Sequence, residues 1–373
     1  MEDGGVVRAV LDMCQALANR GHDVTLFTFC DDDVPQQWKS SHAGVPKVVQ
    51  LNRKGKLWPK LTAESIEVFR KQLVDADALH VHVPWDVTCA ELSRIAKGMN
   101  IPYIVSIHGM LDDWSMRQRH AKKRIYLKIA GRQFLEEAAA VHCTAQAEKD
   151  QACKWYPKGQ SVVVPLIFDL ADYETLPGPE IARQKFASVI PDQTTPLLLF
   201  LSRLHIKKGL ELLIDTAQHL RDSGSSFKII IAGTGEKAYE QQLTQLVNAR
   251  KLTEHISFLG FVTGIEKVSL YEAADIFILP TSQENWGFVL IEALACGTPL
   301  ITTKGVDIWP ELVSSGGAVI ADATVDAMAE AITSLIQDDA KLKSMGAKGR
   351  DWVLENMKLD KILSQYEKLY SNI

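Results

Sequence analysis

Short apolar runs, rich in valine, isoleucine and leucine, alternate with longer stretches of helical periodicity along the whole chain. Runs that are apolar at nearly every position are typical of parallel strands covered on both faces by helices. In the first half these runs lie at residues 23–29, 46–51, 78–83, 103–107, 139–143 and 161–165. In the second half they lie at residues 196–202, 227–232, 256–259, 275–279, 299–302 and 318–320. The alternation predicts an α/β fold built on parallel sheets.

A segment rich in proline and glycine, Thr175-Leu176-Pro177-Gly178-Pro179, interrupts both periodicities near the middle of the chain. We therefore predict an N-terminal domain over residues 1–167 and a C-terminal domain over residues 168–355. A last helix at residues 356–373 would return to the N-terminal domain. We expect two doubly wound domains that face each other across a cleft. Since ligands of open α/β sheets bind outside the carboxyl ends of the strands, the active site would lie between them.

Composition narrows the class of protein. The 373 residues include 41 Lys and Arg against 46 Asp and Glu, a formal net charge of −5, whereas a dedicated nucleic-acid-binding protein would carry a basic excess. The apolar runs are too short to span a bilayer, and the opening Met-Glu-Asp-Gly-Gly lacks the basic and apolar regions of a signal peptide. The six cysteines show no C-x-x-C pair and no metal-ligand spacing. We expect buried thiols in a reducing, cytoplasmic compartment.

Two glutamates flank the start of a predicted helix in the second half. Glu284 follows the apolar run at 275–279 and lies just before the helix, whereas Glu292 lies about two turns into it. Free amides at a helix start favour an anion such as a diphosphate. A carboxylate accepts hydrogen bonds from the hydroxyls of a sugar or a ribose. Two solvated glutamates are the alternative interpretation.

A basic loop, Ser202-Arg203-Leu204-His205-Ile206-Lys207-Lys208-Gly209, directly follows the apolar run at 196–202. Cations at the carboxyl end of a strand can neutralise a departing diphosphate without any metal. An ordinary basic loop is the alternative.

The order of the motifs resembles one enzyme family. The second half contains "SRLHIKKGLELLI", "IIIAGTGE", "ISFLGFV" and "AADIFILPTSQENWGFVLIEALACGTPLITT", and the first half contains "GGVVRAVLDMCQALANRGHDVTLFT", "HVHVPWD", "YIVSIHGMLDDWS" and "AAAVHCTAQAEKD". Together they resemble the retaining GT-B glycosyltransferases of family 4. The resemblance implies two Rossmann-like domains, a nucleotide-sugar donor held mainly by the second and an acceptor held mainly by the first.

The resemblance also assigns roles to single residues. It implies that Arg203 and Lys208 bind the pyrophosphate, that Glu284 holds the hydroxyls of the donor sugar, and that Glu292 holds the ribose hydroxyls. It places His108 of "SIHG" beside the reacting sugar. The other matched positions are Gly4 and Gly5 near the donor phosphates, and Asn285, Trp286, Gly287, Phe288 and Val289 around the sugar and phosphate.

Two segments depart from the family pattern. Pro165-Leu166-Ile167-Phe168-Asp169 stands where the family often has Pro-Asn-Gly-Val-Asp, so bulky apolar residues replace a flexible pair at the domain junction. The sequence after Glu284 reads Asn-Trp-Gly rather than the common Gly-Phe-Gly. We expect Trp286 to shape the sugar pocket.

Other motifs leave alternatives open. A histidine after a strand, such as His108, is often structural, and we take His80, His82 and His142 as core or cleft-wall residues. The turn Gly233-Thr234-Gly235 resembles part of a dinucleotide fingerprint, which keeps an NAD-dependent oxidoreductase as an alternative. A non-catalytic GT-B relic that binds glycans is the other alternative.

Two acidic runs could be mistaken for a metal-binding D-x-D motif: Asp31-Asp32-Asp33 and Asp75-Ala76-Asp77. We interpret both as solvated turns and expect no metal and no cofactor. The expected reaction is the transfer of a hexose, with retention, from a nucleotide diphosphate sugar to a hydroxyl of a polysaccharide (an exopolysaccharide, for example) or a lipid-linked glycan. UDP-hexose, such as UDP-glucose, is the preferred donor, and GDP-mannose comes next.

The stretch from Arg117 to Arg132 carries seven Lys and Arg and no acid, with apolar residues between the charges. It predicts either a solvated basic helix, including one that grips an anionic acceptor, or peripheral contact with an anionic membrane at its inner face.

In the doubly wound domain that this sequence resembles, a buried strand precedes the glycine loop. Here Gly4 and Gly5 stand at the start, and helix-like sequence at residues 6–20 follows at once. We expect about 10–20 further residues before Met1 in the native protein, containing a strand that pairs with residues 23–29.

Overall fold

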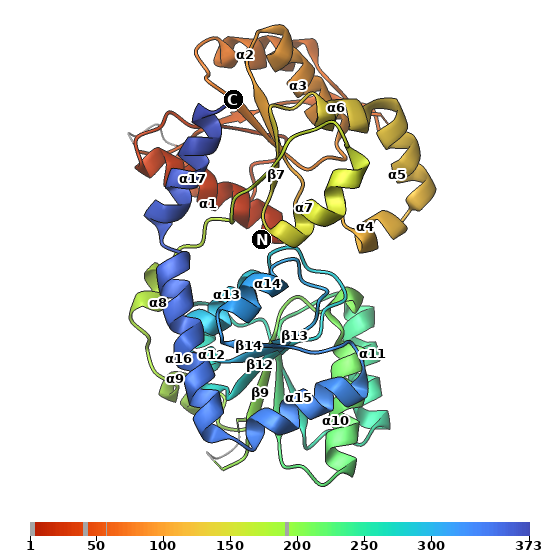
Figure 1. The fold of residues 1–373 in the computed structure, drawn as a ribbon, viewed down its shortest axis with the longest axis vertical. Coiled ribbons are helices and arrows are strands. Elements are labelled where there is room, and N and C mark those ends of the chain that lie inside the picture. Colours follow the sequence, from red (N-terminus) through yellow and green to blue (C-terminus); the bar gives the residue numbers. More distant parts are fainter. Residues whose placement is uncertain (1–3, 40–43, 57, 191–193) are drawn as a thin grey trace. The chain divides into compact units, whose positions relative to one another are not determined.

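The computed structural model describes residues 4–39, 44–56, 58–190 and 194–373. The chain forms two compact units, shown in Figure 1. Unit 1 comprises Met1–Phe168 together with Leu359–Ile373, and unit 2 comprises Asp169–Lys358. The α/β fold class predicted from the sequence is confirmed, and the two units are described one at a time below.

Unit 2 is built on one six-stranded sheet in which every pair of neighbouring strands is parallel. Its strand order is β11-β10-β9-β12-β13-β14. The strands are β9 (Leu197–Leu201), β10 (Lys228–Ala232), β11 (Ile256–Gly260), β12 (Ile276–Leu279), β13 (Leu300–Thr302) and β14 (Ala318–Ile320). The order reverses between β9 and β12, and such a switch point is where open α/β sheets bind ligands.

Helices cover both faces of this sheet, as expected for strands that are buried along their whole length. In Figure 1, α10 and α11 lie to one side of the strands, and α9, α12 and α16 lie to the other. The helices of unit 2 are α8 (Ala171–Glu174), α9 (Glu180–Lys185), α10 (Leu210–Asp222), α11 (Lys237–Ala249), α12 (Gly264–Ala273), α13 (Phe288–Ala295), α14 (Trp309–Ser314), α15 (Val325–Ile336) and α16 (Asp339–Asn356).

Unit 1 contains parallel strands in two separate sheets. One pairs β1 (Thr25–Thr28) with β2 (Lys47–Gln50). The other has the order β5-β6-β7-β8, with β5 (Leu79–His82), β6 (Tyr103–Ser106), β7 (Ala140–Cys143) and β8 (Ser161–Val163). Among the described residues β1 pairs with β2 alone and β5 with β6 alone, so no ladder joins the two sheets. The sequence did not predict the short antiparallel pair β3 (Arg53–Lys54) and β4 (Lys60–Leu61).

The core of unit 1 lies around the four-stranded sheet, where Phe69, Ile104, Ile107 and Leu135 are fully buried. Its helices are α1 (Gly5–Asn19), α2 (Ala63–Leu73), α3 (Val87–Gly98), α4 (Asp113–Arg117), α5 (His120–Tyr126), α6 (Arg132–Glu136), α7 (Gln146–Ala152) and α17 (Leu359–Ser371). A π-helix, η2 (Leu127–Gly131), joins α5 to α6.

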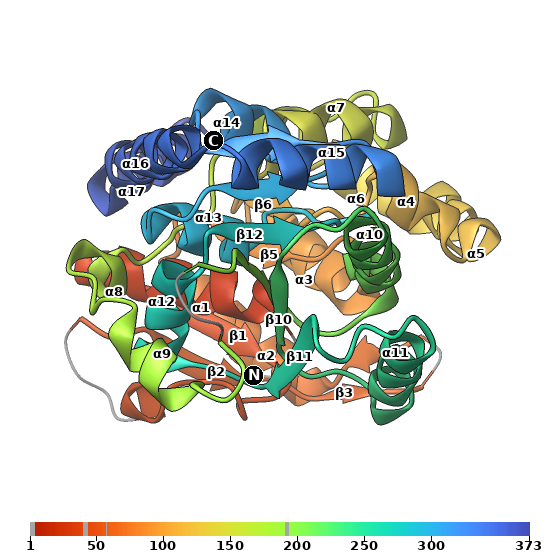
Figure 2. The same ribbon diagram turned by 90° about the horizontal axis from the view of Figure 1, so that it is seen from below.

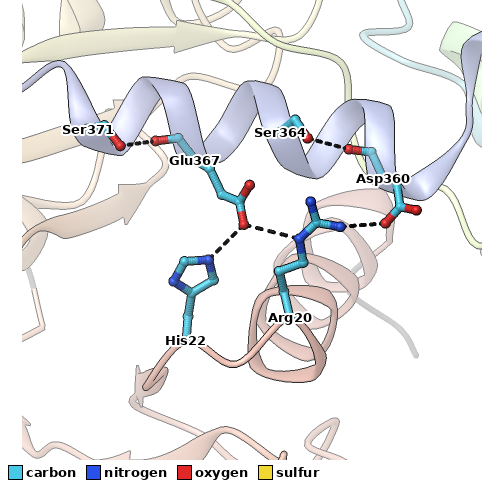
Figure 3. A network of polar contacts seen from close by, with 6 residues as sticks. All are labelled: Arg20, His22, Asp360, Ser364, Glu367 and Ser371. Atoms are coloured by element: carbon cyan, nitrogen blue, oxygen red, sulfur yellow. Dashed lines mark hydrogen bonds and ion pairs between the residues drawn. The ribbon is translucent and has the colours of Figure 1, made fainter.

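The last helix, α17, packs beside α1 although more than 300 residues separate them, and Figure 3 shows the polar contacts that join them. Nη1 of Arg20 lies 2.5 Å from Oδ1 of Asp360, and Nε of Arg20 lies 3.2 Å from Oε1 of Glu367. His22 contacts the same Glu367 oxygen at 3.1 Å. The amphipathic α17 also buries Leu363 and Tyr366 within unit 1.

All twelve strands predicted from the apolar runs are present, and no bound differs by more than two residues. At the junction, Leu166, Ile167 and Phe168 are buried, which agrees with their apolar character. The prediction of buried thiols was wrong for Cys30 and Cys153, which are exposed. Cys30 lies in the loop after β1, and Cys153 begins the short 3-10 helix Cys153–Trp155 that follows α7. No helix in the described part of the chain is both long and apolar enough to cross a membrane.

Candidate active site

The basic loop after β9 folds back against the end of β12. Gly209 has a φ of +74°, and a Cβ atom there would lie 2.0 Å from the carbonyl oxygen of Pro280, so only glycine fits. The carbonyl oxygen of Lys207 accepts hydrogen bonds from the amide of Ser282 at 2.8 Å and the hydroxyl of Thr281 at 2.9 Å. This close backbone approach brings together, at one edge of the sheet, two loops that lie far apart in the sequence.

The loop after β12 is fixed in turn by the loop after β13. The Glu284 amide donates to the carbonyl of Gly305 at 2.8 Å, and its carbonyl accepts from the amide of Asp307 at 2.9 Å. The side-chain amide of Asn285 donates to the Asp307 carboxylate at 3.1 Å. The backbone of Glu284 is therefore held on both sides before any ligand arrives.

Lys208 and Glu284 form a direct ion pair at this edge. The side chains are 8% and 18% exposed, so both charges are largely removed from water. Burial, with the positive charges of Lys207 and Arg203 nearby, lowers the pKa of the Lys208 ammonium. Arg203 is exposed and has no ion-pair partner among the described residues, so its guanidinium is available to an anion.

The helix α13 begins directly after this loop. Gly287, with a φ of +68°, caps its N-terminus, and Phe288 and Val289 start the helix. Trp286 is only 4% exposed, and within the described chain its indole N–H is buried without a hydrogen-bond partner. A buried donor without a hydrogen-bond partner is unfavourable, so a ligand group that accepts a hydrogen bond from this indole would stabilise the site.

Glu292 lies in a second buried ion pair. Its carboxylate is 2.9 Å from Nζ of Lys267 and accepts a hydrogen bond from the hydroxyl of Tyr271 at 3.0 Å. Both partners lie on α12, four residues apart and therefore on one helix face. The Glu292 side chain is 2% exposed. Lys267 and Tyr271 were not predicted as site residues, because their contacts with Glu292 join two different helices.

The glycine turn after β10 allows close packing of two backbones. A Cβ atom on Gly233 would lie 1.9 Å from the carbonyl oxygen of Ser202, and one on Gly235 would lie 2.2 Å from that of Leu204. The amide of Leu204 donates to the carbonyl of Thr234 at 2.9 Å. The turn therefore holds the basic loop after β9 in place.

In unit 1, four histidines lie in or just after β5, β6 and β7. Nδ1 of His82 is 3.0 Å from Nε2 of His108, and their rings stack. Burial, followed by the neighbouring imidazoles, lowers the pKa of His80 and of His108 well below the usual range. The same causes lower the pKa of His82 to about 3, and burial lowers the pKa of His142 to about 4. All of these rings are therefore neutral near pH 7.

The hydrogen bonds of His142 and His80 fix the tautomers of both rings. The Val164 carbonyl can only accept, so Nε2 of His142 carries the proton and donates to it at 2.8 Å. Nδ1 of His142 then accepts from the Ser106 hydroxyl at 2.6 Å, and Ser106 accepts from Nε2 of His80 at 2.8 Å. The Tyr370 hydroxyl, on α17, lies 2.8 Å from the remaining nitrogen of His80.

His108 itself sits in a strained turn. Its φ is +48°, which is uncommon for a residue with a side chain, and Gly109 follows at +69°. The fully buried carboxylate of Glu148 accepts a hydrogen bond from the Gly109 amide and two from Thr144. Glu148 lies in the first turn of α7, whose N-cap is Ala145, and it was not predicted as a site residue from the sequence.

Two predicted site residues, Gly4 and Gly5, lie at the start of the described chain. Gly4 has a φ of +77° and caps α1, and Gly5 is the first residue of that helix. Residues 1–3 lie outside the described residues. Asp75 and Asp77 lie in a turn, as do Asp31 to Asp33.

Two family models match the chain, one in each half. The description "Glycosyltransferase Family 4" matches residues 3–172, and "Glycosyl transferases group 1" matches residues 182–352. The chain belongs to the group 1, family 4 glycosyltransferases. It is an enzyme, and its membership removes both the oxidoreductase and the non-catalytic alternative.

Known glycosyltransferases resemble the chain along most of its length. Alpha-monoglucosyldiacylglycerol synthase of Streptococcus pneumoniae is 24% identical over 306 residues, covering 80% of this chain and 67% of the relative. Sucrose-phosphate synthase of Thermosynechococcus elongatus superposes with a TM-score of 0.80 at 21% identity, covering 99% and 93% of the two chains. HepE of Anabaena, solved with UDP, superposes with a TM-score of 0.79 at 19% identity, covering 99% and 97%. These likenesses agree with the predicted GT-B fold.

Proposed function

We propose that this glycosyltransferase moves a hexose from a nucleoside diphosphate sugar to a hydroxyl of a polysaccharide or lipid-linked glycan, with retention at the anomeric carbon. The buried Lys208–Glu284 pair carries the proposal. Donor binding would separate the pair, and each charge would need a replacement partner, because an uncompensated buried charge is strongly unfavourable.

A nucleotide sugar supplies both replacements in one molecule. Its diphosphate offers an anion to Lys208 and to the exposed Arg203, and its sugar hydroxyls donate hydrogen bonds to Glu284. A free nucleoside diphosphate supplies only the first. The proposal therefore predicts that the sugar part of the donor adds to its affinity, and that this gain depends on Glu284.

The chemistry follows from these contacts. The bond between the anomeric carbon and the diphosphate oxygen breaks, and Lys208, Arg203 and the first amides of α13 stabilise the leaving diphosphate. The acceptor oxygen bonds to the same carbon from the face that the diphosphate leaves, and its proton passes to a diphosphate oxygen. His108, neutral near pH 7, would orient the sugar rather than act as a nucleophile.

We propose that the reaction needs no metal ion, since Lys208, Arg203 and the helix start supply positive charge where the diphosphate would lie. Undiminished turnover in EDTA supports this part of the proposal. Loss of turnover that Mg²⁺ or Mn²⁺ restores contradicts it.

UDP-glucose is the first donor to test. HepE, which shares the fold, was solved with UDP-glucose, and the pneumococcal relative is named for a glucosyl-bearing diacylglycerol lipid. GDP-mannose is the second. The lipid named in that relative supports testing lipid-linked acceptors beside polysaccharide fragments.

Thermal unfolding with UDP, UDP-glucose, GDP, GDP-mannose and NAD tests the donor directly. A ligand at 100 times its dissociation constant adds about 2.7 kcal/mol to the free energy of unfolding. We expect a larger shift with UDP-glucose than with UDP, and an equal shift with the two in Glu284→Gln. The anomeric configuration of the product, read by NMR, tests retention. A larger shift with NAD than with any sugar nucleotide would overturn the donor assignment.

A further inference from the structure

The helical segment of unit 1 that follows α4 presents a strongly basic outer face. It runs through α5 and η2 into α6, and α5 lies at the outside of unit 1 in both views (Figures 1 and 2). Six cations at the end of α4 and along this segment are exposed and have no ion-pair partner within the described chain: Arg117, Arg119, Lys122, Arg124, Lys128 and Arg132.

A different set of side chains fastens this segment to unit 1. The ammonium of Lys123 donates to the carbonyl of Ser115 at 2.6 Å and lies 5.1 Å from the centroid of the Trp85 ring. Leu127 is 4% exposed. The Tyr126 ring covers Gly131 so closely that a Cβ atom there would lie 2.5 Å from it. The segment therefore has an anchored inner side.

Two isoleucines stand among the exposed cations. Ile125 is 59% exposed and Ile129 is 65% exposed, and they lie four residues apart across the start of the π-helix, hence on one face. Most of each isoleucine side chain thus stays in contact with water. A face that combines unpaired cations with aliphatic side chains complements a surface that offers both negative charge and hydrocarbon.

We infer that this outer face docks on the surface of an anionic phospholipid bilayer. The lipid phosphates face the six cations, and Ile125 and Ile129 enter the boundary between headgroups and acyl chains. A nucleic acid or a soluble phosphorylated glycan would satisfy the cations but offers no hydrocarbon to the isoleucines. The Lys123 side chain belongs to the anchored side and takes no part.

Vesicle sedimentation with the full chain tests the inference. We expect binding to vesicles of phosphatidylcholine with about 30% phosphatidylglycerol at low ionic strength, little binding to pure phosphatidylcholine, and loss of binding in about 0.5 M NaCl. The test variant changes Lys122, Arg124 and Lys128 to Ser together, and thereby removes half of the six exposed cations. At about fivefold per cation near the surface, the loss of affinity is about a hundredfold.

Two further variants separate the outcomes. Ile125→Ser with Ile129→Ser keeps every charge, and we expect it to weaken vesicle binding several-fold while leaving binding to heparin unchanged. Lys341→Ser, Lys343→Ser and Lys348→Ser together remove the same charge from α16 and should leave vesicle binding unchanged. Circular dichroism checks that each variant is folded.

Three results would overturn the inference. The first is no binding to the anionic vesicles at low salt. The second is equal loss of vesicle binding in the α16 control, which would indicate a response to net charge alone. The third is heparin binding as tight as vesicle binding with no effect of the isoleucine variant on either, which would assign the face to a soluble polyanion.

Discussion

The two units place different chemistry at the ends of similar parallel strands. In unit 2 the loops after β9 and β12 bring Lys208 against Glu284, and α12 and α13 bring Lys267 against Glu292. In unit 1 the corresponding side chains are neutral imidazoles, hydroxyls and one tyrosine, joined by hydrogen bonds. One fold type thus carries ion pairs in one unit, and in the other a network of neutral side chains beside the buried carboxylate of Glu148.

This difference predicts how each unit responds to ligands and to pH. When a charged ligand binds, each charge of a buried ion pair can take a group of the ligand as its new partner. Unit 2 should therefore bind anions that carry hydroxyls. A network of neutral imidazoles has no charge to exchange near pH 7 but must accept protons when it unfolds in acid. The stability of unit 2 should therefore change mainly with ligand, and the stability of unit 1 mainly with pH.

Substitutions in the Lys208–Glu284 pair should lower turnover most. Lys208→Ala removes a cation from the leaving diphosphate and Glu284→Gln removes the anion that holds the sugar, so each should lower kcat at least about tenfold. Donor turnover under saturating acceptor measures it, with Lys343→Ala on α16 as the surface control. If both variants retain activity within about twofold of the unchanged protein, the assignment of this site is wrong.

A double variant sharpens this test. Lys208→Met with Glu284→Met removes both buried charges, so it should unfold at a higher temperature than Lys208→Ala, because no unpaired charge remains. Its turnover should stay as low as in the single variants. Recovery of turnover along with stability would show that the pair serves folding alone.

Glu292→Ala should have the next largest effect, on both stability and donor binding. It leaves the Lys267 ammonium, whose side chain is only 20% exposed, without its partner. We expect a loss of about 3 kcal/mol in the free energy of unfolding, together with a higher KM for the donor. The matched variant Lys267→Met tests the same pair without touching Glu292. A raised KM in Glu292→Ala with unchanged stability would show that the carboxylate serves the donor and not the pair.

Acid should act selectively on unit 1. The pKa of His142 is about 4 in the folded protein and about 6.5 when unfolded, so between these values the unfolded state binds more protons. The stability present above pH 6.5 is therefore lost as the pH falls from 6.5 toward 4. At pH 5, a histidine with these two pKa values lowers the free energy of unfolding by about 2 kcal/mol.

Hydrogen exchange at about pH 7, 6 and 5 measures this loss in each unit separately. We expect faster opening of β5 to β7 at low pH, with little change in β9 to β12. His142→Gln should flatten the pH dependence in unit 1, whereas His219→Gln on α10 should not. Equal acid sensitivity of the two units would show that the buried histidines do not make unit 1 the more acid-sensitive unit.

Loss of the ion pairs between Arg20 and α17 should change stability only slightly. Arg20→Ala removes both ion pairs of that side chain, so amide exchange in α17 should speed up about two- to fivefold. Exchange in unit 2 should not change. Arg250→Ala, which removes an exposed pair with Asp215 in unit 2, is the matched control. Unchanged exchange in α17 would show that its apolar face alone holds it.

The elements of both units could be predicted because their signals are local. Every long strand is an apolar run bounded by turn residues, and the start of α1 follows from the glycines at 4 and 5. The β3–β4 pair could not be found in this way, since two-residue strands leave no periodicity. The division of the unit 1 strands into two sheets also has no local signal, because it depends on which edges meet.

The site could be predicted only in part, because its contacts join residues that lie far apart in the sequence. The sequence named Lys208 and Glu284 but could not show that they contact each other, because that contact depends on Gly209 packing against Pro280. The partners of Glu292 lie on a different helix, and Glu148 acts on a turn 39 residues away. Residue types indicated what the site could bind, whereas the pairing of charges required the fold.

The return of α17 to unit 1 has a consequence for the order in which the protein is made. Its side chains Tyr370 and Glu367 contact His80 and Arg20, yet they leave the ribosome after all of unit 2. At about 5–20 residues per second, the roughly 190 intervening residues take about 10–40 s to synthesise. For that time the nascent first unit lacks its last helix, and the apolar surface that α17 covers stays open to chaperones.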